Sequence, residues 1–217
     1  MIIVGICGGS GKSTFAERIR DGLSCSCEIM RLDCYYFDQG GKPFEERTKV
    51  NYDSPKIFDF DEMLADIRLL LDGKPVTRKG YNYVEHRRDD SEELMYPPEV
   101  LIIEGIHVFY DDRICDAMNL KLFIKVDSDI CLLRRIARDM NERGRSLESI
   151  SEQYKATVKP MREKYIDRYI DKADVVVMRG GMNEQALKTT ISYLKSCVKE
   201  QRLAESEKNE SDGNDSE

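Results

Sequence analysis

Apolar residues fall into short, nearly continuous runs along the chain, and these runs alternate with longer segments in which apolar residues recur every three or four positions. The runs cover residues 2–6, 29–32, 100–105, 120–126 and 174–178. Runs of this kind are typical of strands that are buried on both faces. Their alternation with helices predicts an α/β fold, in which a five-stranded, mostly parallel sheet carries helices on both faces.

The segments between the runs each present one apolar face, because residues three and four positions apart lie on the same side of a helix. The expected core faces are Phe15, Ile19 and Leu23; Phe60, Met63, Leu64, Ile67 and Leu71; and Leu187, Ile191, Leu194 and Val198. Further helices are expected over about residues 128–142 and on to about residue 169, with a kink at Pro160.

Two segments depart from this alternation. Residues 76–96 hold three short strand-like stretches and a charged turn at residues 85–93, which predict a small β-hairpin insertion. From about residue 203, Glu, Ser, Asn, Asp and Gly predominate, which predicts an acidic, disordered tail. We therefore expect one domain over residues 1–202, a size that suits a single well-filled core, followed by a tail over residues 203–217.

Charge and cysteine content narrow the choice of partner and compartment. The formal net charge is −7, and most of it comes from residues 204–217, which hold six acidic residues and one lysine. The remainder is nearly neutral overall, so no nucleic-acid partner is expected. Seven scattered cysteines indicate free thiols and a cytoplasmic protein. No apolar stretch approaches the ~18 residues that span a bilayer, so no membrane association is expected.

The segment from Gly5 to Thr14 carries the strongest chemical signal. It reads Gly-Ile-Cys-Gly-Gly-Ser-Gly-Lys-Ser-Thr between the first strand and the first helix, which is the layout of a phosphate-binding P-loop. In such a loop, backbone N–H groups converge on phosphate oxygens, the lysine lies along the β- and γ-phosphates, and the serine hydroxyl ligates Mg²⁺. The expected nucleotide-binding residues are Gly8, Gly9, Ser10, Gly11, Lys12, Ser13 and Thr14. The loop is unusually tight, because Ile6 and not glycine stands five residues before Gly11.

Two acidic residues follow strands at the edge where ligands of parallel sheets bind. Glu104 can hold Mg²⁺ together with Ser13, or it can cap the next turn. Asp33 can orient an acceptor hydroxyl and take its proton, or it can cap the turn before Tyr35. These residues by themselves leave both choices open.

Arginines cluster on both sides of Gly144, and they are Arg134, Arg135, Arg138, Arg143 and Arg145. This composition fits a lid over about residues 138–147 that closes over phosphates and excludes water. The alternative is a solvated helix face that pairs with Asp139 and Glu142, but it leaves the arginine beyond Gly144 unexplained.

The chain has only two histidines. His86 lies in the insertion near Tyr81 and Tyr83, and such a group could stack on and hydrogen-bond a flat base, although a lone histidine more often has a structural role. His107 stands in an apolar segment and is expected to be structural.

Several motifs follow one another in a fixed order. They are Leu32-Asp33-Cys34-Tyr35-Tyr36, Asn51-Tyr52-Asp53-Ser54-Pro55, Tyr81-Asn82-Tyr83 with His86 and Arg88, Ile103-Glu104-Gly105-Ile106, the stretch from Arg135 to Arg145, Gln153-Tyr154, Val158-Lys159-Pro160 and Arg179-Gly180-Gly181. With the P-loop, they resemble the uridine kinase (uridine–cytidine kinase) family, within the phosphoribulokinase and uridine kinase group of P-loop kinases. The resemblance extends from Ile2 to about Leu194.

This resemblance implies phosphate transfer from ATP or GTP to the 5′-hydroxyl of uridine or cytidine, in the presence of Mg²⁺. It assigns the role of general base to Asp33 and phosphate contacts to Lys12, Arg138 and Arg143. Ser13 and Glu104 are the residues that it implies for binding Mg²⁺. The matching substrate positions are Asp53, Arg135, Arg145 and Gln153 for the ribose and acceptor end, Tyr81 and His86 for the pyrimidine edge, and Tyr52 and Tyr83 for packing on the ring. Family members are often tetramers, so a homo-oligomer is implied, with a small-molecule nucleoside as partner.

The chain departs from the family pattern at two places. The P-loop is two residues shorter before Gly11, and Asn82 stands where the family has Asp, after Lys79-Gly80 in place of a proline. The acceptor could therefore be another small alcohol, such as a sugar phosphate or pantothenate. The shorter P-loop leaves open the other alternative, a nucleotide-binding protein that transfers no phosphate.

Overall fold

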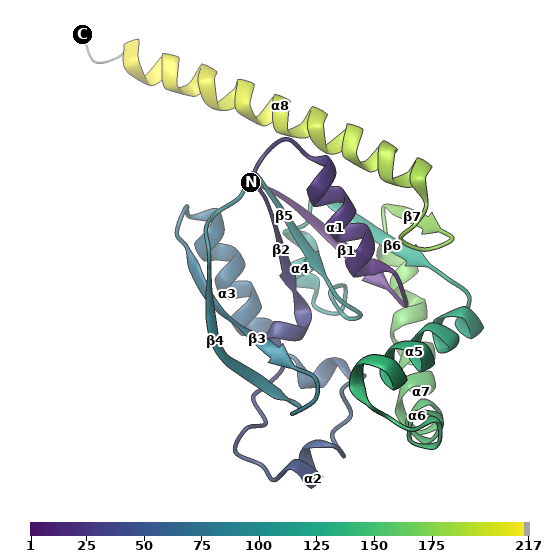
Figure 1. Ribbon diagram of the computed structural model, residues 1–217. Helices are drawn as coiled ribbons and strands as arrows, with labels where there is room; N and C mark the ends of the chain where they lie inside the picture. Colours follow the sequence, from purple (N-terminus) through teal and green to yellow (C-terminus); the bar gives the residue numbers. More distant parts are fainter. Residues whose placement is uncertain (215–217) are drawn as a thin grey trace.

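A parallel sheet of five strands forms the centre of the computed structural model, which describes residues 1–214 (Figure 1). The strands are β1 (Ile2–Gly8), β2 (Cys27–Arg31), β5 (Val100–Glu104), β6 (Leu120–Lys125) and β7 (Val175–Met178). Their order across the sheet is β2-β5-β1-β6-β7, and every pairing is parallel. The α/β fold and the five-stranded sheet expected from the sequence are confirmed.

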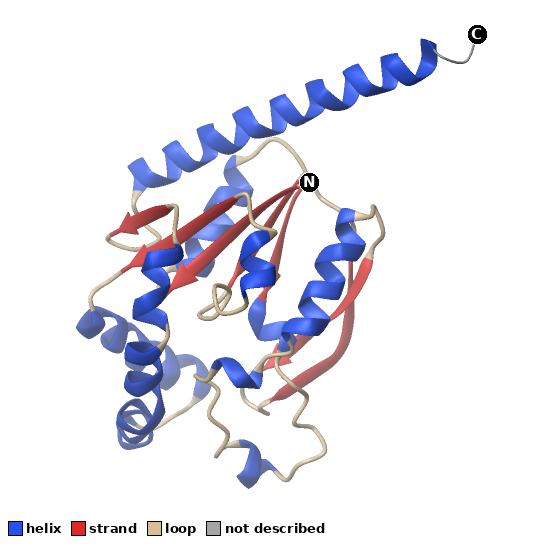
Figure 2. Cartoon of the chain, turned by 180° about the vertical axis from the view of Figure 1, so that it is seen from behind, coloured by secondary structure: helices blue, strands red, loops and turns tan. Residues whose placement is uncertain are grey.

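Alternate residues of β1 face opposite layers of the molecule, because successive side chains of a strand point to opposite faces of the sheet. Val4 and Ile6 belong to the buried cluster formed with α1 and α8, whereas Ile3 and Cys7 belong to the cluster formed with α3 and α4. The bounds of these helices are α1 Lys12–Gly22, α3 Phe60–Leu71, α4 Asp112–Asp116 and α8 Glu184–Asn214. Figure 2 shows helices on both sides of the sheet.

The apolar face of α3 differs by one residue from the expected face. Asp59 caps the helix by accepting a hydrogen bond from the backbone N–H of Glu62 at 2.9 Å. Leu70 is buried, whereas Leu71 is 52% exposed, so the prediction for Leu71 was wrong. The helix ends at Leu71, and Leu70 lies three residues after Ile67 on the face that meets the sheet.

Strand β7 is also less buried than its apolar sequence predicts. Val177 is buried, but Val175, Val176 and Met178 are exposed. The reason is position, because β7 is the outer strand next to β6 and has a neighbour on one side only.

The insertion is a two-stranded antiparallel hairpin, β3 (Val76–Asn82) and β4 (Arg87–Met95). Most of the charged segment expected as a turn is strand β4. Cross-strand ion pairs explain this difference, since Arg78 lies 3.0 Å from Glu93 and Lys79 lies 3.8 Å from Glu92. Arg78 also donates to the backbone oxygen of Ile29 at 2.6 Å and so fastens the hairpin to the outer edge of β2.

The remaining elements lie around the carboxyl ends of the strands. They are α2 (Phe44–Arg47), α5 (Ser128–Arg143), α6 (Leu147–Gln153), α7 (Lys159–Lys164), the 3₁₀ turns Leu32–Tyr35, Pro55–Ile57 and Ile166–Lys172, and a π-helical turn Tyr154–Val158. Gly144 ends α5 with a φ of 62°, a left-handed conformation that turns the chain towards α6. Pro160 lies in the first turn of α7, where the missing N–H costs little.

The C-terminal segment differs from the expected disordered tail. Helix α8 continues to Asn214, well beyond Leu203. Ala204, Glu205 and Glu207 are good helix formers, and Gln201 donates to Glu205 one turn later at 2.9 Å. The prediction for residues 215–217 lies outside the described residues. Within the described part of the chain, no helix combines the length and the apolar character needed to cross a membrane.

Candidate active site

A cleft of about 970 Å³ opens at the carboxyl ends of β1, β2 and β5, between the hairpin and helices α5 and α6. Of the residues predicted for the site, Gly8 alone does not line it. The others that line it are Gly9, Ser10, Gly11, Lys12, Ser13, Thr14, Asp33, Tyr52, Asp53, Tyr81, Tyr83, His86, Glu104, Arg135, Arg138, Arg143, Arg145 and Gln153. Segments far apart in the sequence therefore meet at one site.

The P-loop joins β1 to α1 through glycines in left-handed or crowded positions. Gly11 precedes α1 with a φ of 86°, and a Cβ on Gly8 would lie 2.4 Å from the backbone oxygen of Ile124. The first N–H groups of α1 have no acceptor within the helix and point towards the cleft end of the loop. A Cβ on Gly181 would lie 2.1 Å from the backbone oxygen of Gly11, so the short loop packs directly on the turn before α8.

Ser13 and Glu104 form the pair expected for Mg²⁺. The Ser13 hydroxyl donates to Glu104 at 2.9 Å, and the Arg31 guanidinium lies 3.6 Å from the same oxygen. Burial raises the pKa of Glu104, and the nearby Lys12 ammonium opposes that shift. A hydroxyl and a carboxylate are oxygen donors that suit Mg²⁺, which needs few protein ligands when substrate phosphates complete its shell.

Asp33 lies in the 3₁₀ turn after β2 and contacts the hairpin. The Tyr83 hydroxyl donates to Oδ2 of Asp33 at 2.5 Å. Burial and the neighbouring carboxylate raise the pKa of Tyr83, so the phenol keeps its proton. The Arg143 guanidinium lies over the Tyr83 ring, 4.5 Å from its centroid.

An aromatic wall, formed by Tyr36, Tyr52, Tyr81 and His86, closes the end of the cleft. The rings of Tyr52 and His86 stack at 5.1 Å, and those of Tyr36 and Tyr81 lie 4.6 Å apart. Burial lowers the pKa of His86, and the charge of Arg145 lowers it further, so its imidazole is neutral near pH 7. The Tyr81 hydroxyl is buried beside Tyr52, and burial raises the pKa of Tyr81.

Asp53 is buried beside the aromatic wall and accepts hydrogen bonds from two elements, Arg135 at 3.3 Å and Thr157 at 3.2 Å. Behind it, Nε2 of His107 lies 2.8 Å from the backbone oxygen of Asp53, and Nδ1 lies 2.9 Å from the Tyr169 hydroxyl. Because a carbonyl only accepts, Nε2 carries the proton and Nδ1 accepts from Tyr169. His107 is therefore structural, as expected, but it supports a residue of the site.

Asp139 gathers the arginines of the lid. Its side chain is 0% exposed and lies 2.8 Å from Arg138, 3.2 Å from Arg143, 3.6 Å from Arg135 and 3.7 Å from Arg145. The pairing with Asp139 that the sequence offered as an alternative does occur, but these arginines also line the cleft and do not form a solvated face. Arg135 and Arg145 both donate to the Gln153 side chain, which joins α5 to α6.

Three further residues belong to the site: Arg134, which the sequence marked only as a member of the arginine cluster, and Arg31 and Thr157, which it did not single out. Arg134 donates to the Ser10 hydroxyl at 3.3 Å, Arg31 reaches Glu104, and Thr157 holds Asp53. Membership of the arginine cluster was a signal for Arg134. Nothing in the local sequence marks Thr157, because its partner is 104 residues away.

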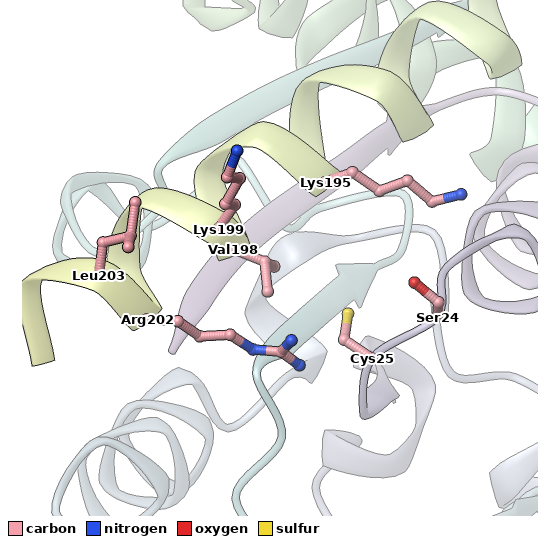
Figure 3. A pocket seen from close by; sticks show the side chains of 7 residues that line it. All are labelled: Ser24, Cys25, Lys195, Val198, Lys199, Arg202 and Leu203. Atoms are coloured by element: carbon pink, nitrogen blue, oxygen red, sulfur yellow. The ribbon is translucent and has the colours of Figure 1, made fainter. Parts of the chain in front are cut away.

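A second hollow, of about 320 Å³, lies beneath α8 and has a different character (Figure 3). The Arg202 side chain extends from α8 towards Cys25. Arg202 donates to both carboxylate oxygens of Glu99, at 2.6 and 2.9 Å, and Ser26 bonds Glu99 as well. These contacts attach α8 to Glu99 directly before β5, and through Glu99 to Ser26 before β2, so we assign this hollow a structural role.

Comparison with known proteins shows the family of the chain. The model of the phosphoribulokinase and uridine kinase family matches residues 2–186. The chain belongs to this family. Similar family members include the uridine kinase of Ligilactobacillus salivarius (strain UCC118), which is 41% identical over 91% of this chain and 94% of that protein. The uridine kinase of Streptococcus pyogenes serotype M5 (strain Manfredo) is 42% identical over 92% and 97%, respectively.

Solved structures of other kinases share the fold at much lower identity. Phosphoribulokinase from Rhodobacter spheroides has a TM-score of 0.61 at 14% identity, over 82% of this chain and 69% of that chain. D-glycerate 3-kinase from Cryptococcus neoformans var. grubii has a TM-score of 0.54 at 13% identity, over 76% and 79%. At such identities the similarity concerns the fold alone.

Proposed function

We propose that this protein transfers the γ-phosphate of ATP or GTP to the 5′-hydroxyl of uridine or cytidine, in pyrimidine salvage in the cytoplasm. One observation carries the proposal: a single cleft is lined by the P-loop, the carboxylate of Asp33 and the aromatic wall. The relatives named above are uridine kinases and match nearly the whole chain.

The nucleotide end of the cleft offers positive charge and free N–H groups. The residues proposed for the triphosphate are Gly8, Gly9, Ser10, Gly11, Lys12, Ser13 and Thr14, with Gly8 acting through the loop backbone. Mg²⁺, held by Ser13 and Glu104, would neutralise charge on the phosphates. Arg138 and Arg143, fixed by Asp139, would stabilise charge on the transferring phosphoryl group.

The acceptor end offers hydrogen bonds and flat surfaces. Asp53, Arg135, Arg145 and Gln153 form one hydrogen-bonded group that suits the ribose hydroxyls. The neutral imidazole of His86 and the Tyr81 hydroxyl suit the donors and acceptors at a pyrimidine edge, while the Tyr52 ring offers a stacking surface.

The chemistry proposed for Asp33 is that of a general base. The acceptor hydroxyl passes its proton to the carboxylate while its oxygen bonds the γ-phosphorus, and the bond from that phosphorus to the bridging oxygen of the donor breaks. Water would compete with the acceptor, so closure of the arginine-rich lid over the phosphates favours transfer over hydrolysis.

An acceptor panel tests this function. We expect ADP formation with uridine and cytidine. Little is expected with ribulose 5-phosphate, glycerate or pantothenate, because these three compounds lack a pyrimidine ring that could pack on the aromatic wall. Initial rates with ATP and Mg²⁺ measure it, and Asp33→Asn is the control, with an expected fall in kcat of at least ~10². Turnover of a sugar phosphate or pantothenate without turnover of either nucleoside would refute the acceptor while retaining the kinase class. Nucleotide binding without transfer to any acceptor would refute the kinase activity itself.

A further inference from the structure

The contact between Tyr83 and Asp33 joins the hairpin to the carboxylate proposed as the base. The two residues are 50 positions apart, and the Tyr83 hydroxyl lies 2.5 Å from Oδ2 of Asp33. Resemblance to the family assigns Tyr83 only to packing on the substrate ring. A hydroxyl at this distance from a carboxylate makes a strong, charge-assisted hydrogen bond, which ring packing does not require.

Neighbouring side chains fix the direction of this hydrogen bond. The Tyr81 ring meets the Tyr83 ring edge-on at 5.2 Å and 76°, and Arg143 lies over the Tyr83 ring. The ring is thus held between its own hairpin and the lid. Burial and the Asp33 carboxylate raise the pKa of the Tyr83 phenol, so its hydroxyl is the donor in this bond near neutral pH.

The other oxygen of the carboxylate remains available. In the part of the chain whose side chains are described, the Asp33 carboxylate accepts no hydrogen bond other than that from Tyr83. One oxygen is therefore held, and Oδ1 is free to accept a proton from a substrate in the cleft.

We propose that Tyr83 is a positioning residue for phosphate transfer: its hydroxyl holds Oδ2 of Asp33 so that Oδ1 faces the acceptor hydroxyl, and Arg143 links this arrangement to the lid. The inference rests on the proposed role of Asp33 as the base. During transfer, the acceptor proton moves to Oδ1 and Tyr83 keeps its own proton. Holding a reacting group in one orientation speeds the chemical step, because the carboxylate does not have to rotate into place before each transfer.

Tyr83→Phe is the decisive variant, because it keeps the ring and removes only the hydroxyl. We expect kcat to fall about tenfold while KM for the acceptor stays within about twofold, since the lost hydrogen bond acts on the chemical step. Tyr96→Phe, at an exposed tyrosine after β4, is the matched control and should behave as wild type. Unchanged kcat in Tyr83→Phe would overturn the inference and leave ring packing as the role of Tyr83.

A double-mutant cycle shows whether Tyr83 acts through Asp33. In an Asp33→Asn background, Tyr83→Phe should cause no further loss of kcat, because the group that it positions has gone. A further tenfold loss in that background would overturn the inference. If the acceptor panel reveals a substrate other than a nucleoside, the same cycle is measured with that substrate.

A third measurement needs no turnover, so it separates this inference from the proposed function. The ¹³Cγ resonance of Asp33, assigned by its absence in Asp33→Asn, should move in Tyr83→Phe and stay in place in Tyr96→Phe, without any substrate. A wild-type enzyme that phosphorylates nothing, together with a resonance that moves, would refute the function and retain the contact. A resonance that does not move would overturn the inference whatever the activity.

Discussion

His107 illustrates how a residue outside the cleft controls one inside it. Its imidazole donates to the backbone oxygen of Asp53 and accepts from Tyr169, an arrangement that only the neutral ring can make. Burial lowers the pKa of His107 to about 4, although the hydrogen bond to Asp53 favours the charged form. The neutral ring therefore keeps Asp53 in place for the ribose hydroxyls proposed above.

The protonation of His107 predicts how stability depends on pH. Between the unfolded value of 6.5 and the folded value of about 4, the unfolded chain binds a proton that the folded chain does not. The stabilisation is complete above pH 6.5 and is lost as the pH falls towards 4, at up to about 1.4 kcal/mol per pH unit. Urea denaturation from pH 7.5 to 5 should show this slope in the wild type, in addition to the slope that the carboxylates cause.

His107→Gln is the matched variant, because its amide can still donate to the Asp53 carbonyl but does not titrate. Its free energy of unfolding should fall less steeply with decreasing pH than that of the wild type. Equal slopes for the two proteins would contradict a neutral, buried His107.

At the scale of elements, the P-loop depends on the turn before α8. The loop is two residues shorter than in the family pattern, yet α1 begins at Lys12 and Ser13 reaches Glu104. Gly181 lies directly against Gly11, so the turn before α8 packs on the short P-loop and supports it. The short loop therefore still brings Ser13 to Glu104.

This packing predicts a defect in nucleotide binding for Gly181→Ala. The added Cβ would lie 2.1 Å from the backbone oxygen of Gly11 and 3.1 Å from the backbone nitrogen of Phe15, so the loop must shift. We expect Kd and KM for ATP to rise about tenfold, since a displacement of about 1 Å at a binding loop is costly. Calorimetric titration with ATP and initial rates measure the effect.

Gly41→Ala serves as the control for that experiment, because no atom lies within 4 Å of its added Cβ. Its affinity for ATP should match the wild type. A Gly181→Ala protein with wild-type affinity would show that the turn is free to move away from the loop.

The elements also show what local sequence could and could not predict. Apolar runs predicted the five strands, and the P-loop motif predicted where α1 begins. The end of strand β4 was predicted, but its charged part, residues 87–93, was taken for a turn. The ion pairs with β3 that stabilise this part form only once the hairpin is paired. The lid was predicted from its arginines, but the central place of Asp139 depends on how α5 and the residues after Gly144 fold together.

At the scale of the whole molecule, the site combines residues of very different predictability. Lys12, Ser13, Asp33 and Glu104 follow strands, and parallel strands place such residues at one edge of the sheet. The bonds that hold them, such as Tyr83 to Asp33 and Thr157 to Asp53, join segments 50 and 104 residues apart. These separations are far longer than any sequence periodicity or short motif, so the contacts can be found only in the folded chain.

The last helix provides a test of which part of α8 the fold requires. Leu194 is 0% exposed and belongs to the cluster between α8, α1 and the sheet, whereas Leu203 is 53% exposed on the same helix. Leu194→Ala should lower the free energy of unfolding by about 2–5 kcal/mol, because it removes buried methyl groups and leaves a cavity. Leu203→Ala should change it by less than about 0.5 kcal/mol, since both residues favour helices and little buried surface is lost. Urea denaturation of the two variants measures the difference, and equal losses would mean that the exposed part of α8 is covered in solution by something that its sequence did not predict.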